Sequence, residues 1–192
     1  MANHFNLSRY KELLNLKKDN KISFLDENFR ELLKYEVNVE KQIAYDRKEI
    51  YFLLISKFLN RSIEICDFES QLKELQKQDN RKSKIVLENF EELQAFPLAS
   101  DLNIFSDSIY NISEGCFDYY ESFVDLKPIT KDELYDLINK YYSQLQATFP
   151  TAQEIAESTK RNYEELVSRS FKVLASSLGL ILGFNVLFLN LN

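Results

Sequence analysis

The sequence contains very little glycine and proline. Only three of its 192 residues are glycine and three are proline. Sheets that are joined by tight turns need these residues, so their scarcity favours long helices. Pro97, Pro128 and Pro150 also fall between segments with a helical apolar pattern. The sequence therefore predicts an all-α protein, folded as an antiparallel helical bundle.

Histidine is almost absent. The single histidine, His4, lies next to the N-terminus, which argues against Ser-His-Asp or Cys-His catalysis and against histidine-based metal sites. No cluster of glycines precedes a predicted helix, so phosphate-binding loops are not expected either. Carboxylates alone could support acid–base chemistry, but most of them fall at solvent-facing helix positions. We therefore expect a non-enzymatic protein with no cofactor and no metal.

Acidic residues outnumber basic ones, 30 to 24, and the net charge is −6. Such a chain is repelled by phosphate backbones, so we expect no nucleic acid among its partners. An acidic surface favours partner proteins with a basic surface. Cys66 and Cys116 lie far apart, and we expect both to be reduced and buried. Abundant Ile, Lys, Asn, Phe and Tyr, without Trp, indicate AT-rich codons, as in a plastid or an AT-rich bacterium.

Apolar residues recur at steps of three and four along the first half of the chain. We expect a short helix near residues 7–14 and a second helix capped by Asp26. A longer helix should end near Asn60. Its apolar face is expected to comprise Ile43, Ile50, Leu53, Leu54 and Phe58. Asp67 is the expected cap of the next helix, and the polar stretch 76–84 is expected to be a loop or a solvated turn.

The most regular pattern lies in the second half of the chain. An a/d-type apolar seam comprises Leu102, Phe105, Ile109, Ile112, Cys116, Tyr119 and Phe123. Acidic residues are expected on the opposite side of this helix. They are Asp107, Glu114, Asp118, Glu121 and Asp125. These five residues are the candidate protein-binding surface, although an ordinary solvated helix face would give the same pattern.

Two capping boxes mark the starts of the last two predicted helices. Thr130 and Glu133 form the first, and Thr151 and Glu154 form the second. The helix between them should bury a stripe that comprises Leu134, Leu137, Ile138, Tyr141 and Leu145.

Residues 173–191 contain no charged residue. As a helix they would span about 28 Å, close to the thickness of a bilayer core. Ala175, Gly179 and Gly183 recur every four residues, which is typical of helices that pack closely in a membrane. Basic residues before this run would keep the large domain on the cytoplasmic or stromal side of the membrane. The alternative is a buried helix in a soluble cytoplasmic bundle.

Two stretches resemble the colicin D type of immunity domain, over about residues 50–146. They are IYFLLISKFLNRSIEICDFESQLKEL and ITKDELYDLINKYYSQL. The positions that carry the resemblance are Phe58, Leu59, Ile63, Ile65 and Phe68, followed by the amphipathic helix from Leu134 to Leu145. The resemblance implies a four-helix bundle that binds a basic tRNA-cleaving toxin domain through acidic surface residues.

Three parts are therefore expected: N-terminal helices over residues 1–48, a bundle over 49–149, and a long C-terminal helix over 151–192 with the anchor 173–191. The predicted function is a membrane-anchored adaptor or linker subunit of a larger assembly, such as a photosynthetic complex of the plastid thylakoid. The alternative prediction is an immunity-type inhibitor of a basic nuclease toxin.

Overall fold

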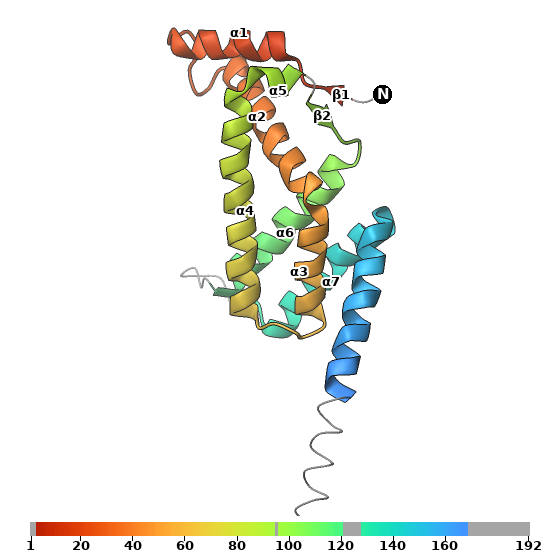
Figure 1. The fold of residues 1–192 in the computed structure, drawn as a ribbon. Helices are drawn as coiled ribbons and strands as arrows, with labels where there is room; N and C mark the ends of the chain where they lie inside the picture. The colour runs from red at the N-terminus through yellow and green to blue at the C-terminus, as the bar shows by residue number, and fades with distance from the viewer. Residues whose placement is uncertain (1–2, 95, 121–127, 169–192) are drawn as a thin grey trace, which may run out of the picture.

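The structure is a computed structural model, and it describes residues 3–94, 96–120 and 128–168. The described residues form a bundle of helices with one short pair of strands (Figure 1). In chain order the elements are β1 (Asn3–His4), α1 (Leu7–Lys18), α2 (Glu27–Asp46), α3 (Lys48–Leu59), α4 (Ile65–Glu88), α5 (Phe90–Gln94), β2 (Pro97–Leu98), α6 (Leu102–Tyr120), α7 (Lys131–Thr148) and a final helix over residues 150–168. The predicted all-α class is confirmed.

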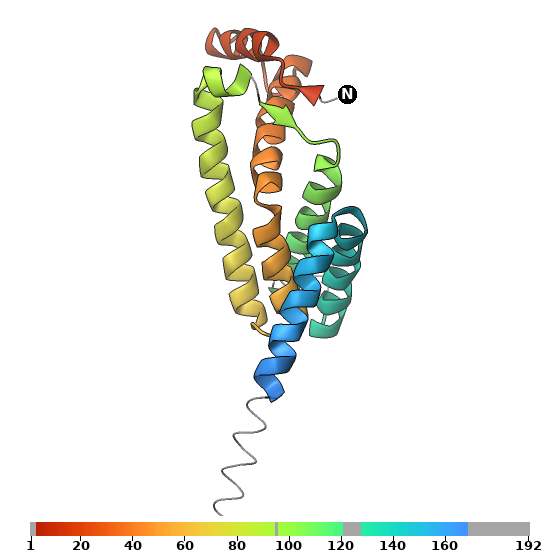
Figure 2. The same cartoon turned by 45° about the vertical axis from the view of Figure 1, so that its right-hand side comes forward.

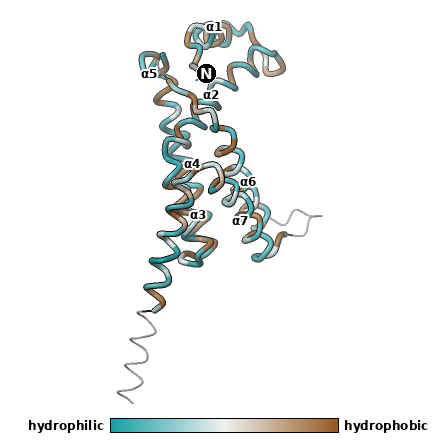
Figure 3. Tube along the Cα trace, turned by 90° about the vertical axis from the view of Figure 1, so that its right-hand side faces the viewer, coloured by the Kyte–Doolittle hydropathy of each residue, from teal (hydrophilic) through white to brown (hydrophobic). Residues whose placement is uncertain are grey.

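The buried side chains form two apolar clusters. The first joins α3, α4, α6 and α7 around Phe58, Phe68 and Phe105. The second joins α1 and α2 to the end of α4 and to α5, around Leu13, Leu32 and Leu93. Apolar and polar residues alternate along the helices (Figure 3), as expected for amphipathic helices that each bury one side. α4 is long enough to contribute to both clusters.

Several local predictions are confirmed. Asp26 caps α2, because its side chain accepts a hydrogen bond of 3.1 Å from the backbone N–H of Asn28. The capping box of α7 is complete: Thr130 Oγ1 accepts from the Glu133 N–H at 3.2 Å, and Glu133 Oε2 accepts from the Thr130 N–H at 2.7 Å. The seam of α6 is buried from Leu102 to Cys116. Its last predicted member, Phe123, lies outside the described residues.

The prediction of a loop over residues 76–84 is wrong. α4 continues through this stretch without a break to Glu88. On its buried face, Asp79 and Ser83 lie between Leu72 and Val86. A helix prediction from apolar periodicity requires apolar residues at these buried positions. Because both residues are polar, the apolar pattern is interrupted although the helix continues.

The predicted helix end near Asn60 is confirmed, because α3 ends at Leu59. The helix is not continuous from Ile43, however: it is interrupted at Arg47, which ends α2 and precedes α3. Of the predicted apolar face, Ile43, Leu54 and Phe58 are buried, whereas Ile50 and Leu53 are exposed.

Two predicted caps also differ from the structure. α4 begins at Ile65 after Glu64, so Asp67 lies inside its first turn. The final helix begins at residue 150, and Thr151 is already helical. Proline favours the first helical position, since its missing N–H would have no partner there. Pro150 therefore starts this helix directly after Phe149.

The final helix lies beside the bundle at its start and extends beyond the bundle at its C-terminal end (Figure 2). Ala152 and Thr159 are buried, whereas every residue from 160 to 168 is exposed. Within the described ranges, no helix is long and apolar enough to cross a membrane. The predicted anchor 173–191, with Ala175, Gly179 and Gly183, lies outside the described residues.

Candidate functional site

The acidic row on α6 is exposed as far as the structure describes it. Asp107, Glu114 and Asp118 all face solvent. Steps of seven and four residues return to the same side of a helix, so the three carboxylates follow one line. Glu121 and Asp125, the other two predicted members, lie outside the described residues. From here on, the acidic row means Asp107, Glu114 and Asp118.

The surroundings of the acidic row suit a protein contact. Tyr110 lies between Asp107 and Glu114 on the same side of α6 and is 62% exposed. Tyrosine is enriched among the residues that dominate binding energy at interfaces. Lys41 of α2 lies 3.6 Å from Asp107, and such an exposed pair contributes little energy. A cationic side chain of a partner protein can therefore replace Lys41 beside Asp107.

Two hollows lie beside each other along α2, and sequence analysis did not predict them. The larger has a volume of about 610 Å³ and the smaller about 250 Å³. Val37 and Glu40 line both, so the hollows meet at these residues. α2 contacts both α4 and α6, and it lies between them in Figure 2. We call the two hollows together the α2 groove.

A polar cluster contributes Tyr51 and Asp79 to the lining of the α2 groove. Asp79 of α4 is buried, and it accepts hydrogen bonds from Arg47 and from the hydroxyl of Tyr51, the latter at 2.5 Å. Arg47 also donates to Gln78 at 3.0 Å. Because a buried carboxylate is costly unless it is paired, Arg47 and Tyr51 explain how Asp79 is accommodated. The cluster links α4 to the junction between α2 and α3.

The ionisation of this cluster is strongly perturbed at Tyr51. Burial is the main cause that raises the pKa of Tyr51 far above its ordinary value, and the adjacent Asp79 carboxylate raises it further. The hydroxyl therefore stays protonated and serves as a donor to Asp79. A tyrosine that cannot lose its proton near neutral pH is unsuited to general-base chemistry.

The two cysteines differ in their environments. Cys116 is buried in the seam, and burial raises the pKa of its thiol to about 12. Such a thiol is unreactive at neutral pH because the thiolate is the nucleophile. Cys66 is exposed in the first turn of α4, so the prediction that both thiols are buried is wrong for this residue. The period of the apolar pattern places Phe68, not Cys66, toward the core.

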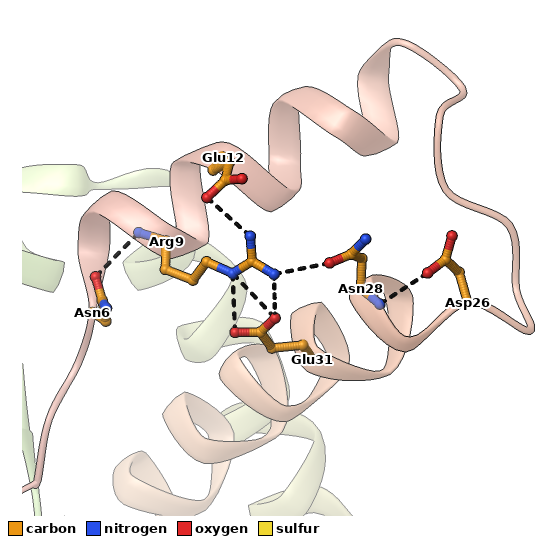
Figure 4. A network of polar contacts seen from close by, with 6 residues as sticks. All are labelled: Asn6, Arg9, Glu12, Asp26, Asn28 and Glu31. Carbon is orange, nitrogen blue, oxygen red and sulfur yellow. Dashed lines mark hydrogen bonds and ion pairs between the residues drawn. The ribbon is translucent and has the colours of Figure 1, made fainter.

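A hydrogen-bonded network joins α1 to α2 (Figure 4). Arg9 of α1 donates three hydrogen bonds to the carboxylate of Glu31 of α2, and a fourth to Asn28 at 2.8 Å. Arg9 also pairs with Glu12 of its own helix at 2.9 Å. The network fixes α1 against α2. Tyr10, the neighbour of Arg9, therefore stays in place as part of the wall of the larger hollow.

In the described part of the chain, no group of three or more His, Cys, Asp and Glu residues is arranged to hold a metal ion. Comparison with protein-family models, curated proteins and solved structures finds no match. The resemblance to immunity domains thus stays a prediction.

The sequence did carry one signal for the polar cluster. Asp79 lies seven residues after Leu72 and seven before Val86, and a step of seven returns to nearly the same side of a helix. A carboxylate in phase with apolar residues indicates a buried acidic group. The α2 groove has no comparable signal, because residues far apart in the chain form its walls.

Proposed function

We propose that the chain is a non-enzymatic, membrane-anchored adaptor that binds a partner protein with a basic surface. The observation that carries this proposal is the exit of the final helix. Its residues 160–168 are all exposed, and the described members of both apolar clusters precede them. The charge-free run 173–191 follows a few residues later. We therefore assign this run to a bilayer as part of the proposal.

The acidic row supplies the contact in this proposal. Its carboxylates and Tyr110 combine long-range attraction with an aromatic side chain that can be buried at an interface. In a plastid, such an adaptor would link subunits of a photosynthetic assembly at the stromal face of the thylakoid. Its partner would carry lysine or arginine residues at matching positions.

The second candidate is an immunity-type inhibitor of a basic nuclease toxin. The charge distribution favours it: residues 89–168 include fifteen acidic and five basic residues. A strong field of one sign accelerates the capture of an oppositely charged protein. An inhibitor of this kind needs no membrane, so the position of the chain in the cell distinguishes the two candidates.

Membrane fractionation tests the adaptor proposal directly. We expect the full chain to stay with membranes after a carbonate wash, which removes peripheral proteins. The matched control is the chain that ends at Lys172, which should be released into the supernatant. Release of the full chain by carbonate would contradict the membrane anchor and favour the inhibitor.

Charge reversal tests the acidic row. The double variant Glu114→Lys/Asp118→Lys should weaken partner binding about tenfold or more at low salt, and less at high salt, because screening shortens the range of the attraction. Glu154→Lys/Glu157→Lys is the control, with the same change in net charge on the exposed side of the final helix. Both variants are compared with the parent chain in pull-downs of the same co-purifying protein at two salt concentrations. Equal losses in the two variants would mean that net charge, not the row, drives binding.

A further inference from the structure

We propose that the α2 groove binds an amphipathic helix of a partner protein, one whose apolar stripe is flanked by lysine or arginine. This site adjoins the acidic row, because Tyr110 and Lys41 also line the smaller hollow, and it does not depend on the membrane anchor.

The dimensions of the groove suit a helix. Along α4 its wall extends from Gln76 in the smaller hollow to Glu88 in the larger one. Twelve residue steps at 1.5 Å each give about 18 Å, or roughly three turns of a helix. A helix of this length presents apolar side chains at positions i, i+3 or i+4, and i+7, which is the usual way that a helix occupies a groove.

Exposed apolar side chains mark both ends and the centre of the groove. Val37 stands where the hollows meet and is 45% exposed. Phe90 lines the larger hollow and Tyr110 the smaller, and both are also exposed. Apolar residues in contact with water along a concave surface favour binding of another apolar surface. The three side chains together supply apolar contacts for the stripe of a short amphipathic helix.

The charges of the groove specify the flanks of that helix. Glu36 and Glu40 lie one turn apart on α2, both on one flank of Val37, and Glu88 of α4 lies on the opposite wall. None of the three belongs to an ion pair among the described residues. The Asp79 carboxylate is already paired with Arg47. Two lysines also line the groove: Lys41, which is paired with Asp107, and Lys84. Because the three glutamates outnumber Lys84, the groove favours cationic side chains beside the apolar stripe.

The same charges argue against the chain's own apolar segment as the occupant. Residues 173–191 carry no charge, so their insertion would shield Glu36 and Glu40 from water without supplying a cation. Burying carboxylates in that way is unfavourable. A partner helix with lysine or arginine avoids this cost.

The test uses synthetic peptides of fourteen residues as probes. One is a leucine–lysine helix with leucine at the positions i, i+3, i+4 and i+7, and the other has glutamate in place of every lysine. We expect fluorescence anisotropy to show binding of the leucine–lysine peptide, and at least tenfold weaker binding of the leucine–glutamate peptide. Equal binding of the two peptides would overturn the proposed charge preference.

Two pairs of variants localise the binding. Val37→Glu should weaken binding of the leucine–lysine peptide at least tenfold. Ile104→Glu is its control, because Ile104 is 47% exposed and thus as exposed as Val37. This control should change binding less than twofold. Glu36→Gln/Glu40→Gln should weaken binding at least threefold. Glu154→Gln/Glu157→Gln removes the same charge elsewhere and should change it less than twofold.

Three results would overturn the proposal. Equal effects within either pair would mean that the peptide binds without using the groove. Self-association of the chain that Val37→Glu abolishes would assign the groove to a second copy. If the chain that ends at Lys172 binds the peptide more tightly than the full chain does, the apolar segment 173–191 is the occupant of the groove. The glutamine variants keep the proposal testable if Val37→Glu does not fold.

Discussion

Replacing Asp79 with alanine should destabilise the protein more than any ordinary substitution in a polar stretch. Asp79 is buried and has two hydrogen-bonded partners, Arg47 and Tyr51. Alanine at position 79 would leave the buried Tyr51 hydroxyl without an acceptor, at a cost of about 1–3 kcal/mol. Arg47 would lose its ion pair as well.

The contribution of Arg47 is smaller than in a fully buried pair. Breaking such a pair costs about 3–5 kcal/mol, but the Arg47 side chain is 22% exposed and also donates to Gln78. Water and Gln78 can therefore compensate part of its charge. We expect Asp79→Ala to lower the free energy of unfolding by about 2–4 kcal/mol.

A double-mutant cycle with Tyr51→Phe isolates the mechanism. Phenylalanine has no hydroxyl to leave without an acceptor, so Asp79→Ala should cost about 1–2 kcal/mol less in the Tyr51→Phe background. Urea unfolding followed by circular dichroism measures all four free energies. Strictly additive effects, or a loss below about 0.5 kcal/mol for Asp79→Ala alone, would refute a buried, interdependent cluster.

Three further predictions concern stability. Thr130→Ala removes the side-chain cap of α7 and should lower the free energy of unfolding by about 1 kcal/mol in the same urea assay, while Thr148→Ala at the other end of the helix is the control and should change it less. Burial raises the pKa of both Tyr10 and Tyr142 to about 12; since the unfolded chain loses these protons near pH 10, stability should fall as pH rises from about 10 to 12. Tyr142→Phe should make that fall shallower in urea titrations at several pH values, and an unchanged slope would contradict the pKa assignment. The chain that ends at Lys172 should unfold cooperatively on heating with strong helical circular dichroism, whereas a gradual transition would show that residues 173–192 belong to the core.

Local patterns in the sequence were sufficient to predict much of the helix content. A helix and its caps depend on hydrogen bonds between residues a few positions apart, so Asp26 and the pair Thr130 and Glu133 could be assigned without knowing the tertiary structure. The buried seam of α6 also follows from a period that its own residues carry. The exposure of Asp107, Glu114 and Asp118 follows from the same period.

Only the tertiary structure decided the remaining features. The stretch 76–84 is helical although its inward positions include Asp79, because Arg47 and Tyr51 approach from another part of the chain and pair with that carboxylate. The break at Arg47 likewise determines which side of α3 is buried. The α2 groove depends on how five helices pack around α2, and no local pattern encodes a gap between segments that are distant in sequence. Burial and pairing are properties of these long-range contacts, and local periodicity carries no information about them.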